Sequence, residues 1–277
     1  MDNHVRFIAV SYFGSADAAA LVESLMGQWD PRWTLVLVDN SQSPSELAAL
    51  EVLASMDQRV QVLDSRGNLG YYGGASAALR LLPASPRWTC VCNVDLTVAN
   101  DAVGEVLRDS ESSIGVLAPG IWSQKTGHDQ NPYMRSRPSR RATFLRYWMF
   151  RWTPVARILV AASALKGGLR VRPRLALDTS SDIYAPHGAC IFFSTRYFQA
   201  GGDFEHPVFL FGEEITVAEN CARLGLKVGY RPQVRVYHNE HRATGTWRSK
   251  NVLNAQREAA RFLRAVLGGP RRGGSGC

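Results

Sequence analysis

The stretch W-T-C-V-C-N-V-D-L-T, residues 88–97, decides the expected fold. Its first five residues have the continuous apolar character of a strand that is covered on both faces, and small polar residues follow at Asn93 and Asp95. In open α/β folds, ligands bind at the edge of the sheet where such strands end. Oxygen ligands suit Mg²⁺ and Mn²⁺, so Asp95 is a candidate for holding a divalent cation or a ribose hydroxyl. An Asp after a strand is also common as a turn former or a helix N-cap.

Strands and helices alternate on both sides of this stretch. Apolar runs predict strands at residues 5–12, 33–38, 60–63, 88–92 and 114–117. Apolar residues at helical spacing predict helices at residues 16–28, 44–56, 73–82 and 99–108. This alternation is typical of a parallel, doubly wound sheet with helices on both faces. The pattern returns later, with strands at residues 183–194, 227–230 and 234–237 and helices at 213–224 and 247–267.

The totals fit one large α/β domain or two small ones, because 277 residues with 45% apolar content can bury a full core. The five cysteines show no C-x-x-C spacing and no disulfide framework, which favours a reducing, cytoplasmic setting. The sequence shows no signal peptide and no run of about 18 apolar residues that could span a bilayer.

The net charge of +8 is concentrated in one segment. Residues 135–174 hold eleven Lys or Arg and no Asp or Glu, so removing this segment from the net +8 leaves −3 for the remaining chain. Residues 123–142 are polar and rich in Arg and Pro and are expected to form a mobile loop, and residues 143–165 combine aromatic side chains with arginines. This composition suits a helix lying in the headgroup layer of an anionic membrane. The alternatives are a helical hairpin packed on the domain and a nucleic-acid site, for which no recognition module is found.

A glycine-rich stretch, R-G-N-L-G-Y-Y-G-G-A-S at residues 66–76, lies between two strands that end in Asp39 and Asp95. Glycines let the backbone approach a ligand closely, and the following helix turns its amide-rich end toward the same place. The spacing matches neither the phosphate-binding P-loop nor the dinucleotide fingerprint. A plain strand-to-helix turn explains the glycines equally well, and only the grouping with Asp39 and Asp95 favours a ligand site.

Two adjacent carboxylates, Glu213 and Glu214, follow the apolar run P-V-F-L-F at residues 207–211. The helix dipole favours acidic residues at a helix start, which accounts for one of them. A partly buried carboxylate has a raised pKa and is suited to taking a proton from a hydroxyl. His238 closes the strand at residues 234–237, and a lone His in such a position is more often structural than functional.

Six motifs in order are similar to family 2 glycosyltransferases, especially the bacterial ones that build O-antigen and capsule, rhamnosyltransferases among them. The motifs are D39-N, N68-L-G-Y-Y-G-G, N93-V-D-L, H187-G-A-C, F211-G-E-E and V236-Y-H238. The resemblance covers residues 5 to about 240 and leaves out the basic segment and the tail. It implies a GT-A fold, the Rossmann-like α/β fold with a mixed sheet of nucleotide-diphospho-sugar transferases, here with a basic, aromatic helical insertion.

The resemblance also implies roles for single residues. A nucleotide-sugar site would be formed by Ser11, Tyr12, Asp39, Asn40, Asn68, Gly70, Asn93 and Asp95. Asp95 would bind the Mn²⁺ or Mg²⁺ that bridges the diphosphate, with His238 completing the metal site. Glu214 would be the catalytic base with Glu213 as its neighbour, and His187 and Gly188 would lie beside the sugar and the acceptor.

Three departures from the family pattern affect these roles. Asn93 replaces the first acid of the D-x-D motif, so the cation has one carboxylate fewer. Glu214 stands where relatives carry Asp, which leaves the choice between Glu213 and Glu214 as the base open. Ala75-Ser76 replaces a frequent Asn-Asn pair in the glycine-rich loop.

The expected function is inverting transfer of a hexosyl or rhamnosyl unit from a UDP-, dTDP- or GDP-sugar to a hydroxyl of a glycan or a polyprenyl-diphosphate-linked acceptor in cell-surface polysaccharide synthesis. A single base with no second acid facing it suggests inversion. The expected location is the inner face of the cell membrane, with the enzyme bound peripherally through its basic segment and no nucleic-acid partner.

Residues 1–267 are expected to form one domain. It comprises a nucleotide-binding half (1–120), the insertion (123–181) and an acceptor half (182–267), followed by a flexible tail (268–277). Two other functions remain open. A sugar-nucleotide pyrophosphorylase should carry a glycine- and lysine-rich signature, but residues 11–18, S-Y-F-G-S-A-D-A, offer no Lys or Arg. A non-catalytic membrane-surface binding protein would be compatible with the changes at Asn93 and Glu214.

Overall fold

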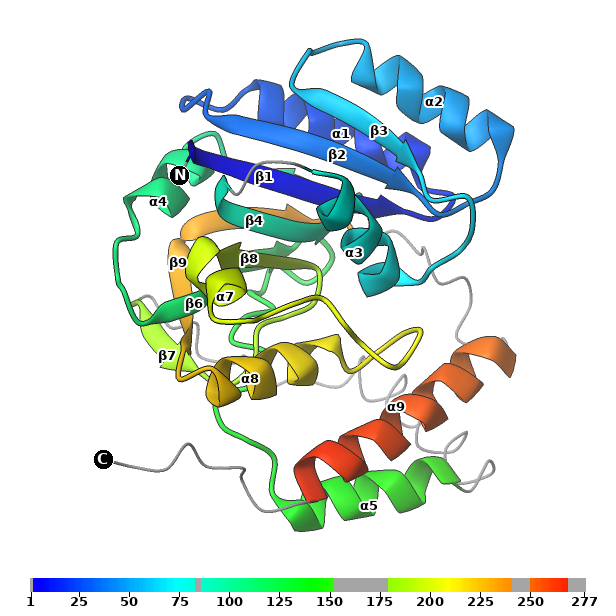
Figure 1. Ribbon diagram of the computed structural model, residues 1–277, viewed down its shortest axis with the longest axis vertical. Helices are drawn as coiled ribbons and strands as arrows, with labels where there is room; N and C mark the ends of the chain where they lie inside the picture. The colour runs from blue at the N-terminus through cyan, green and yellow to red at the C-terminus, as the bar shows by residue number, and fades with distance from the viewer. Residues whose placement is uncertain (1, 83–85, 152–178, 241–249, 269–277) are drawn as a thin grey trace.

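A single mixed sheet forms the centre of the molecule (Figure 1). The computed structural model describes residues 2–82, 86–151, 179–240 and 250–268. Within them the sheet has nine strands in the order β3-β2-β1-β4-β8-β6-β9-β5, and β7 pairs with β9 beside this path. The strands are β1 (Asp2–Ser11), β2 (Trp33–Asp39), β3 (Val60–Asp64), β4 (Pro86–Asn93), β5 (Leu96–Val98), β6 (Ile114–Ser123), β7 (Ser181–Ile183), β8 (Cys190–Ser194) and β9 (Lys227–His238).

Helices cover both faces of the sheet. They are α1 (Ser15–Met26), α2 (Pro44–Ala54), α3 (Tyr71–Leu81), α4 (Ala102–Arg108), α7 (Thr195–Gln199) and α8 (Glu213–Arg223). Two further helices, α5 (Arg140–Arg151) and α9 (Lys250–Gly268), pack against each other away from the sheet. Successive strand residues point to opposite faces, so Phe7 joins the core beneath α1, α2 and α4, and Ile8 joins the core beneath α3, α7 and α8. This two-sided burial confirms the α/β reading of the apolar runs. The four cysteines in the described residues are free and buried.

The sheet is mixed, because β5, β7 and β8 run antiparallel to their neighbours while β6 and β9 pair parallel, and this corrects the parallel sheet expected from the alternation of elements. β3, β2, β1 and β4 run parallel, whereas β8 lies antiparallel between β4 and β6. Parallel neighbouring strands are joined by a crossover connection. The chain instead enters β8 from β7, which pairs with β9. The mixed sheet that the family resemblance implied is therefore confirmed.

The second half also differs in its strand boundaries. Residues 183–194 contain the end of β7 and the whole of β8, separated by Pro186, which has no backbone N–H for a sheet ladder. Residues 227–238 form one strand, β9, rather than two, and its pairing with β6 shifts register between Arg231 and Arg235. Despite this shift in register, β9 continues as one strand to His238.

The loop after β6 was expected to be a plain polar loop, yet two of its polar side chains are buried. Asp129 is 8% exposed and accepts hydrogen bonds from the Tyr230 hydroxyl (2.6 Å) and from the backbone N–H groups of Ile121 and Asn131 (2.8 Å each). Burial raises the pKa of the Asp129 carboxyl, and these hydrogen bonds oppose the shift. Because every one of these contacts is internal, the loop is part of the packed structure.

Part of the basic segment is helical. α5 begins at Arg140 and packs against α9 (Figure 1), while residues 152–178 lie outside the described residues, as does the tail 269–277. The apolar side of α9 packs through Leu263 and Leu267 on Ile215 of α8. Among the described residues, no helix combines the length and the apolarity needed to cross a bilayer.

Candidate functional site

The carboxyl ends of the parallel strands bring the expected residues to one edge of the sheet. Ser11 at the end of β1 pairs in register with Asp39 at the end of β2, and Val10 pairs with Asn93 at the end of β4. Asp95 follows two residues later, next to the pairing of Leu96 with His238. Residues far apart in the sequence therefore meet where ligands bind in open α/β sheets.

The nucleotide half of this edge is built on Asp39 and Asn40, which are both almost fully buried. Asp39 Oδ1 accepts a hydrogen bond from the backbone N–H of Ser41 at 2.8 Å. Asn40 donates from Nδ2 to the carbonyl oxygen of Gly70 (2.9 Å), and its backbone N–H donates to the Ser11 carbonyl (2.9 Å). Asn40 Oδ1 and Ser11 Oγ are buried without a hydrogen-bond partner among the described residues. Tyr12, the next residue on this edge, is exposed.

Unusual backbone conformations gather at the same edge. The residues after β1, β2 and β3 include Phe13, Gln42 and Arg66, with φ of 54°, 57° and 55°. Non-glycine residues rarely adopt positive φ, and strained positions of this kind cluster at ligand sites and active sites. Because such a residue follows each of three neighbouring strands, this edge of the sheet has the backbone strain that is typical of ligand sites.

The glycine-rich loop contacts both halves of the site through Gly70. Gly70 has a φ of 74°, and its backbone N–H donates to Asn68 Oδ1 at 3.1 Å. A Cβ placed on Gly70 would lie only 2.6 Å from the carbonyl oxygen of Phe209, in the segment before α8. The close approach requires a residue without a side chain, so the loop that was expected to face the nucleotide also packs on the segment leading to Glu213.

Asp95 and His238 form a pair suited to a divalent cation. Asp95 Oδ1 lies 3.4 Å from His238 Nε2, and the two side chains are 8% and 10% exposed. Carboxylate oxygen and imidazole nitrogen both suit Mn²⁺. Among the described residues, no group of three or more His, Cys, Asp or Glu side chains could hold a metal. A cation at this pair thus needs further ligands from a bound diphosphate or water. Asn93 lies beside the pair, half-buried, and its backbone N–H donates to the Ala189 carbonyl at 2.9 Å.

Glu213 and Glu214 meet the segment of His187 and Gly188. A Cβ placed on Gly188 would lie 3.1 Å from Oε1 of Glu213 and 3.1 Å from Oε1 of Glu214. The Tyr71 hydroxyl, at the start of α3, donates to the Gly188 carbonyl at 2.9 Å. A Cβ at this position would crowd both carboxylates, so the segment of His187 and Gly188 lies directly against the carboxylate pair.

The backbone before α8 has an unusual turn that delivers the carboxylates. Phe211 and Gly212 have φ of 71° and 96° in succession. His206 Nε2 lies 3.2 Å from the Phe211 carbonyl, and its Nδ1 lies 2.8 Å from Thr216 Oγ1. Burial lowers the pKa of His206, which favours a neutral ring that donates from Nε2 and accepts at Nδ1. His206 therefore holds the turn to the first helical residues.

The environment of the pair keeps one of its carboxyl groups protonated. Desolvation, with the negative charge of Glu214 as a second cause, raises the pKa of Glu213 to about 8, against a usual value of 4.5. At pH 7 Glu213 therefore holds a proton.

This pKa predicts a pH dependence of stability. Between pH 4.5 and about 8 the unfolded chain ionises Glu213 while the folded protein keeps the proton. The folded state thus binds more protons, and the free energy of unfolding falls as pH rises through this window. The substitution Glu213→Gln removes the carboxyl group that titrates in this window. We therefore expect the wild type to lose stability relative to Glu213→Gln from pH 5 to pH 8 in urea unfolding. Parallel stability curves for the two proteins would contradict this assignment.

His187 is oriented by its neighbours. Its backbone N–H donates to Asn131 Oδ1 at 2.8 Å, and its Nδ1 accepts from the Ala189 N–H at 3.2 Å. Its ring packs against Tyr133 and His238, with ring centroids 5.6 and 6.1 Å away, respectively.

Three residues of the site, Tyr71, Asn131 and His206, were not among those expected from the sequence. Of these three residues, only Tyr71 could have been found from the sequence, because it lies in the glycine-rich stretch.

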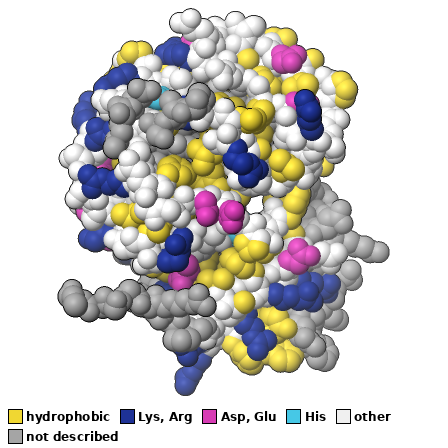
Figure 2. Space-filling view, in the orientation of Figure 1, with side chains coloured by type: hydrophobic (Ala, Val, Ile, Leu, Met, Phe, Trp, Pro, Cys, Tyr) yellow, Lys and Arg dark blue, Asp and Glu magenta, His cyan; other side chains and the backbone are white. Residues whose placement is uncertain are grey.

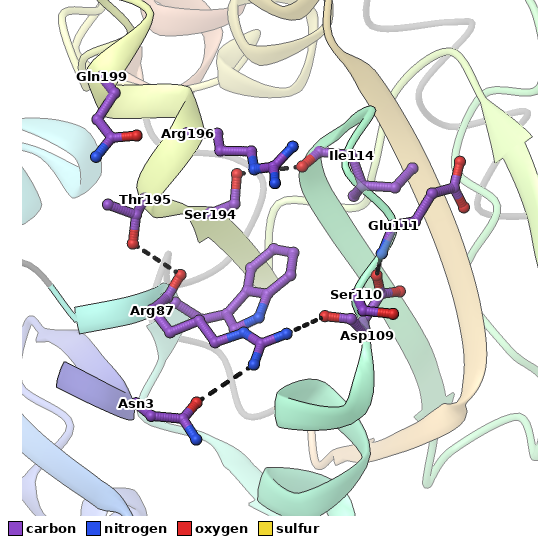
Figure 3. Close-up of a pocket in the computed structure, with 11 residues that line it drawn as sticks. Asn3, Arg87, Asp109, Ser110, Glu111, Ile114, Ser194, Thr195, Arg196 and Gln199 are labelled. Atoms are coloured by element: carbon purple, nitrogen blue, oxygen red, sulfur yellow. Dashed lines mark hydrogen bonds between the residues drawn. The ribbon is translucent and has the colours of Figure 1, made fainter. Parts of the chain in front are cut away.

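A pocket of about 620 Å³ lies at the opposite edge of the sheet, at the start of β4 and of β6 (Figure 3). Polar groups along its wall bond to one another. Arg87 donates to the Asp109 carbonyl (2.7 Å) and to Asn3 Oδ1 (3.3 Å), and Thr195 Oγ1 donates to the Pro86 carbonyl (2.6 Å). None of the expected site residues lines this pocket, so the candidate site remains at the carboxyl edge.

Comparison with known proteins identifies a family. The profile of the family described as Glycosyl transferase family 2 matches residues 7–159, and none of the curated protein sequences matches the chain. Among solved structures, GalNAc-T7 with UDP, GalNAc and Mn²⁺ is similar, with a TM-score of 0.58 and 15% identity. That match covers 90% of this chain and 47% of the other, so the chain spans about half the length of GalNAc-T7.

Two further structures share the fold. The mannosyltransferase PcManGT from Pyrobaculum calidifontis, in complex with GDP-Man and Mn²⁺, has a TM-score of 0.56 at 13% identity, over 96% of this chain and 74% of the other. TarS from S. aureus has a TM-score of 0.56 at 13% identity, over 86% of this chain and 37% of the other. At such identities these likenesses establish the GT-A fold alone.

Proposed function

Since the chain belongs to glycosyl transferase family 2, we propose that it moves a sugar from a nucleotide-diphospho-sugar to an acceptor hydroxyl with inversion at the anomeric carbon. The observation that carries this proposal is the meeting of three groups at one sheet edge: the buried Asp39–Asn40 pair, the Asp95–His238 pair and the Glu213–Glu214 carboxylates. We propose a single domain in which residues 1–120 bind the nucleotide and residues 182–267 bind the acceptor.

The donor lies, in this proposal, along the carboxyl ends of β1, β2 and β4. The exposed ring of Tyr12 offers a surface for the base, Asp39 and Asn40 form the floor, and Asn68 and Gly70 line the pocket. The unpartnered atoms Asn40 Oδ1 and Ser11 Oγ support a polar ligand near this floor, because buried polar groups normally have a partner. UDP- and GDP-sugars are the leading donors, since two proteins of the same fold were solved with UDP and with GDP-Man; a dTDP-sugar remains a candidate.

Asp95 and His238 would hold Mn²⁺ or Mg²⁺. Asn93, two residues before Asp95, would contact the donor. A cation there would stabilise the charge that develops on the diphosphate as it leaves. Two protein ligands fit a cation that binds together with its nucleotide.

Glu214 is the general base in this proposal, because its neighbour Glu213 already holds a proton at pH 7 and so cannot take one from the acceptor. Glu214 accepts the proton of the acceptor hydroxyl while that oxygen attacks the anomeric carbon and the nucleoside diphosphate departs. His187 and Gly188 border the space between Glu214 and the cation pair and so position the sugar.

A thermal-shift panel tests the donor site. UDP, GDP, dTDP and CMP are each added with and without Mn²⁺ or Mg²⁺. A ligand that binds only the folded state at a hundredfold excess over its Kd stabilises it by about 2.7 kcal/mol. We expect one nucleoside diphosphate to raise the unfolding midpoint and to need the cation for its full effect. No shift with any nucleotide would instead favour the non-catalytic binding protein.

We further propose that the face formed by α5 and α9 rests on an anionic membrane, where a polyprenyl-diphosphate-linked glycan acceptor lies. Phe144, Leu145 and Trp148 of α5 are exposed, and arginines flank them: Arg140, Arg141, Arg261 and Arg264 are all exposed. Figure 2 shows apolar and basic side chains side by side at this end of the molecule. Each nearby cation adds about 1 kcal/mol of attraction to anionic lipid. Because α9 packs against the start of α8, this face is connected to the helix that carries Glu213 and Glu214.

Vesicle co-sedimentation tests this surface. Loss of two arginines should weaken binding to phosphatidylserine-containing vesicles about 30-fold or more, from about 1 kcal/mol for each cation. We therefore expect Arg140→Glu/Arg141→Glu to stay in the supernatant, while the equally charged control Arg80→Glu/Arg223→Glu, on exposed residues of α3 and α8, pellets like the wild type. Equal pelleting of the two variants would contradict the α5–α9 surface.

A further inference from the structure

His238 has a second contact, on the side of its ring away from Asp95. Its Nδ1 lies 2.8 Å from Oε1 of Gln130, and Nε2 of Gln130 donates to Oε1 of Glu240 at 2.6 Å. Gln130 comes from the loop after β6, and Glu240 follows β9 two residues after His238. The three side chains form a chain of hydrogen bonds that ends at the cation pair.

The chemistry of these groups fixes the direction of each hydrogen bond. The Glu240 carboxylate can only accept, so the NH₂ end of the Gln130 amide must face it. The carbonyl end of the amide then faces His238 Nδ1, which must carry the proton and donate. In the neutral ring the other nitrogen, Nε2, is left with its lone pair, and this is the nitrogen that lies 3.4 Å from Asp95 Oδ1.

We propose that Gln130 is a positioning residue that holds His238 in the Nδ1–H tautomer, with the Nε2 lone pair beside Asp95 and ready for a divalent cation. The inference rests on the proposed function in that it assigns the Asp95–His238 pair to the cation. Gln130 contacts neither the donor nor the acceptor in this scheme and acts through His238 alone.

Gln130 is itself held firmly. It lies between Asp129 and Asn131, the two buried polar residues of the loop, and its backbone N–H donates to the Ile121 carbonyl at 2.7 Å. Glu240 is held as well, because Lys125 donates from Nζ to its carbonyl oxygen. A rigid acceptor opposite Nδ1 is what a metal-binding histidine normally has, and loss of such a partner typically weakens metal binding about 10- to 100-fold.

The test uses two variants of the full chain. Gln130→Met keeps the length of the side chain and removes the acceptor. Gln130→Glu/Glu240→Gln exchanges the two groups, so that residue 130 still accepts from Nδ1 and still bonds to residue 240. ¹⁵N NMR of the metal-free proteins reports the tautomer of His238. Titration with Mn²⁺ alone, followed by paramagnetic broadening of the His238 ring signals, reports cation binding, and thermal midpoints report folding.

We expect the wild type and the exchange variant to show the Nδ1–H tautomer and the same Mn²⁺ response. Gln130→Met should show mixed tautomers and need about 10- to 100-fold more Mn²⁺ for the same broadening. A wild-type ring protonated at Nε2, or a Gln130→Met variant with unchanged tautomer and Mn²⁺ response, would overturn the inference. If the tautomers are as expected but Mn²⁺ never broadens the wild-type ring, the tautomer assignment stands and the proposed cation site fails.

Discussion

Glu214→Gln is expected to lower kcat for sugar transfer by about 10²- to 10⁴-fold, the usual contribution of a positioned general base. The amide keeps the size of the side chain but cannot accept the proton of the acceptor hydroxyl. Donor binding should be unaffected, because the proposed nucleotide site is formed by Asp39 and Gly70 on the other half of the site. Steady-state kinetics with the donor found by the thermal-shift panel measure the effect.

Glu213→Gln is the matched control for this prediction. At pH 7 Glu213 holds a proton, and a glutamine resembles that neutral form, so kcat should change by less than about tenfold. The two variants have the same composition, and they differ only in which carboxyl group is replaced by an amide. If Glu213→Gln lost the activity and Glu214→Gln kept it, the roles of the two residues would be reversed.

Gly70→Ala is expected to destabilise the protein by about 2–6 kcal/mol and to reduce activity as well. With φ of 74° and ψ of 178°, Gly70 has a backbone conformation almost restricted to glycine, which costs a residue with a Cβ about 1–3 kcal/mol, and forcing an atom into a packed region costs about 1–3 kcal/mol more. The added Cβ would lie 2.6 Å from the Phe209 carbonyl oxygen, so the segment that leads into Glu213 must move. Urea unfolding and kcat together measure the two effects.

Gly225→Ala separates the two causes. Gly225 also has a positive φ, of 67°, but nothing lies within 4 Å of a Cβ placed there. This control should lose only the conformational share, about 1–2 kcal/mol, with activity unchanged. Equal losses at Gly70 and Gly225 would mean that the contact with Phe209 is unimportant.

The first half of the fold could be predicted from the sequence because its strands are continuous apolar runs. The predicted ends of the strands at residues 33–38 and 60–63 lie within one residue of β2 and β3. The direction of β8 could not be predicted, because an apolar run has the same pattern whether it pairs parallel or antiparallel. That direction is set by the long path of the chain between β6 and β8.

The candidate site was predictable where a polar residue ends a strand. Asp39, Asp95 and His238 each follow an apolar run, and strand ends meet at a sheet edge. Gln130 and Asn131 had no such signal, since they lie in a stretch whose polar composition is typical of a surface loop. Their side chains are fixed by hydrogen bonds with His238, His187 and the Pro119 carbonyl, which only the folded chain brings together.

The central claim is that Asp95 and His238 hold a cation together with a nucleoside diphosphate, and Mn²⁺ electron paramagnetic resonance tests it most directly. The fraction of bound Mn²⁺ is measured with UDP and with GDP on the wild type and on Asp95→Asn, which keeps the size of the side chain. We predict nucleotide-dependent Mn²⁺ binding in the wild type and a loss of about 100-fold or more in the variant, because loss of outer partners alone costs about 10- to 100-fold. Equal Mn²⁺ binding by the two proteins would contradict the account.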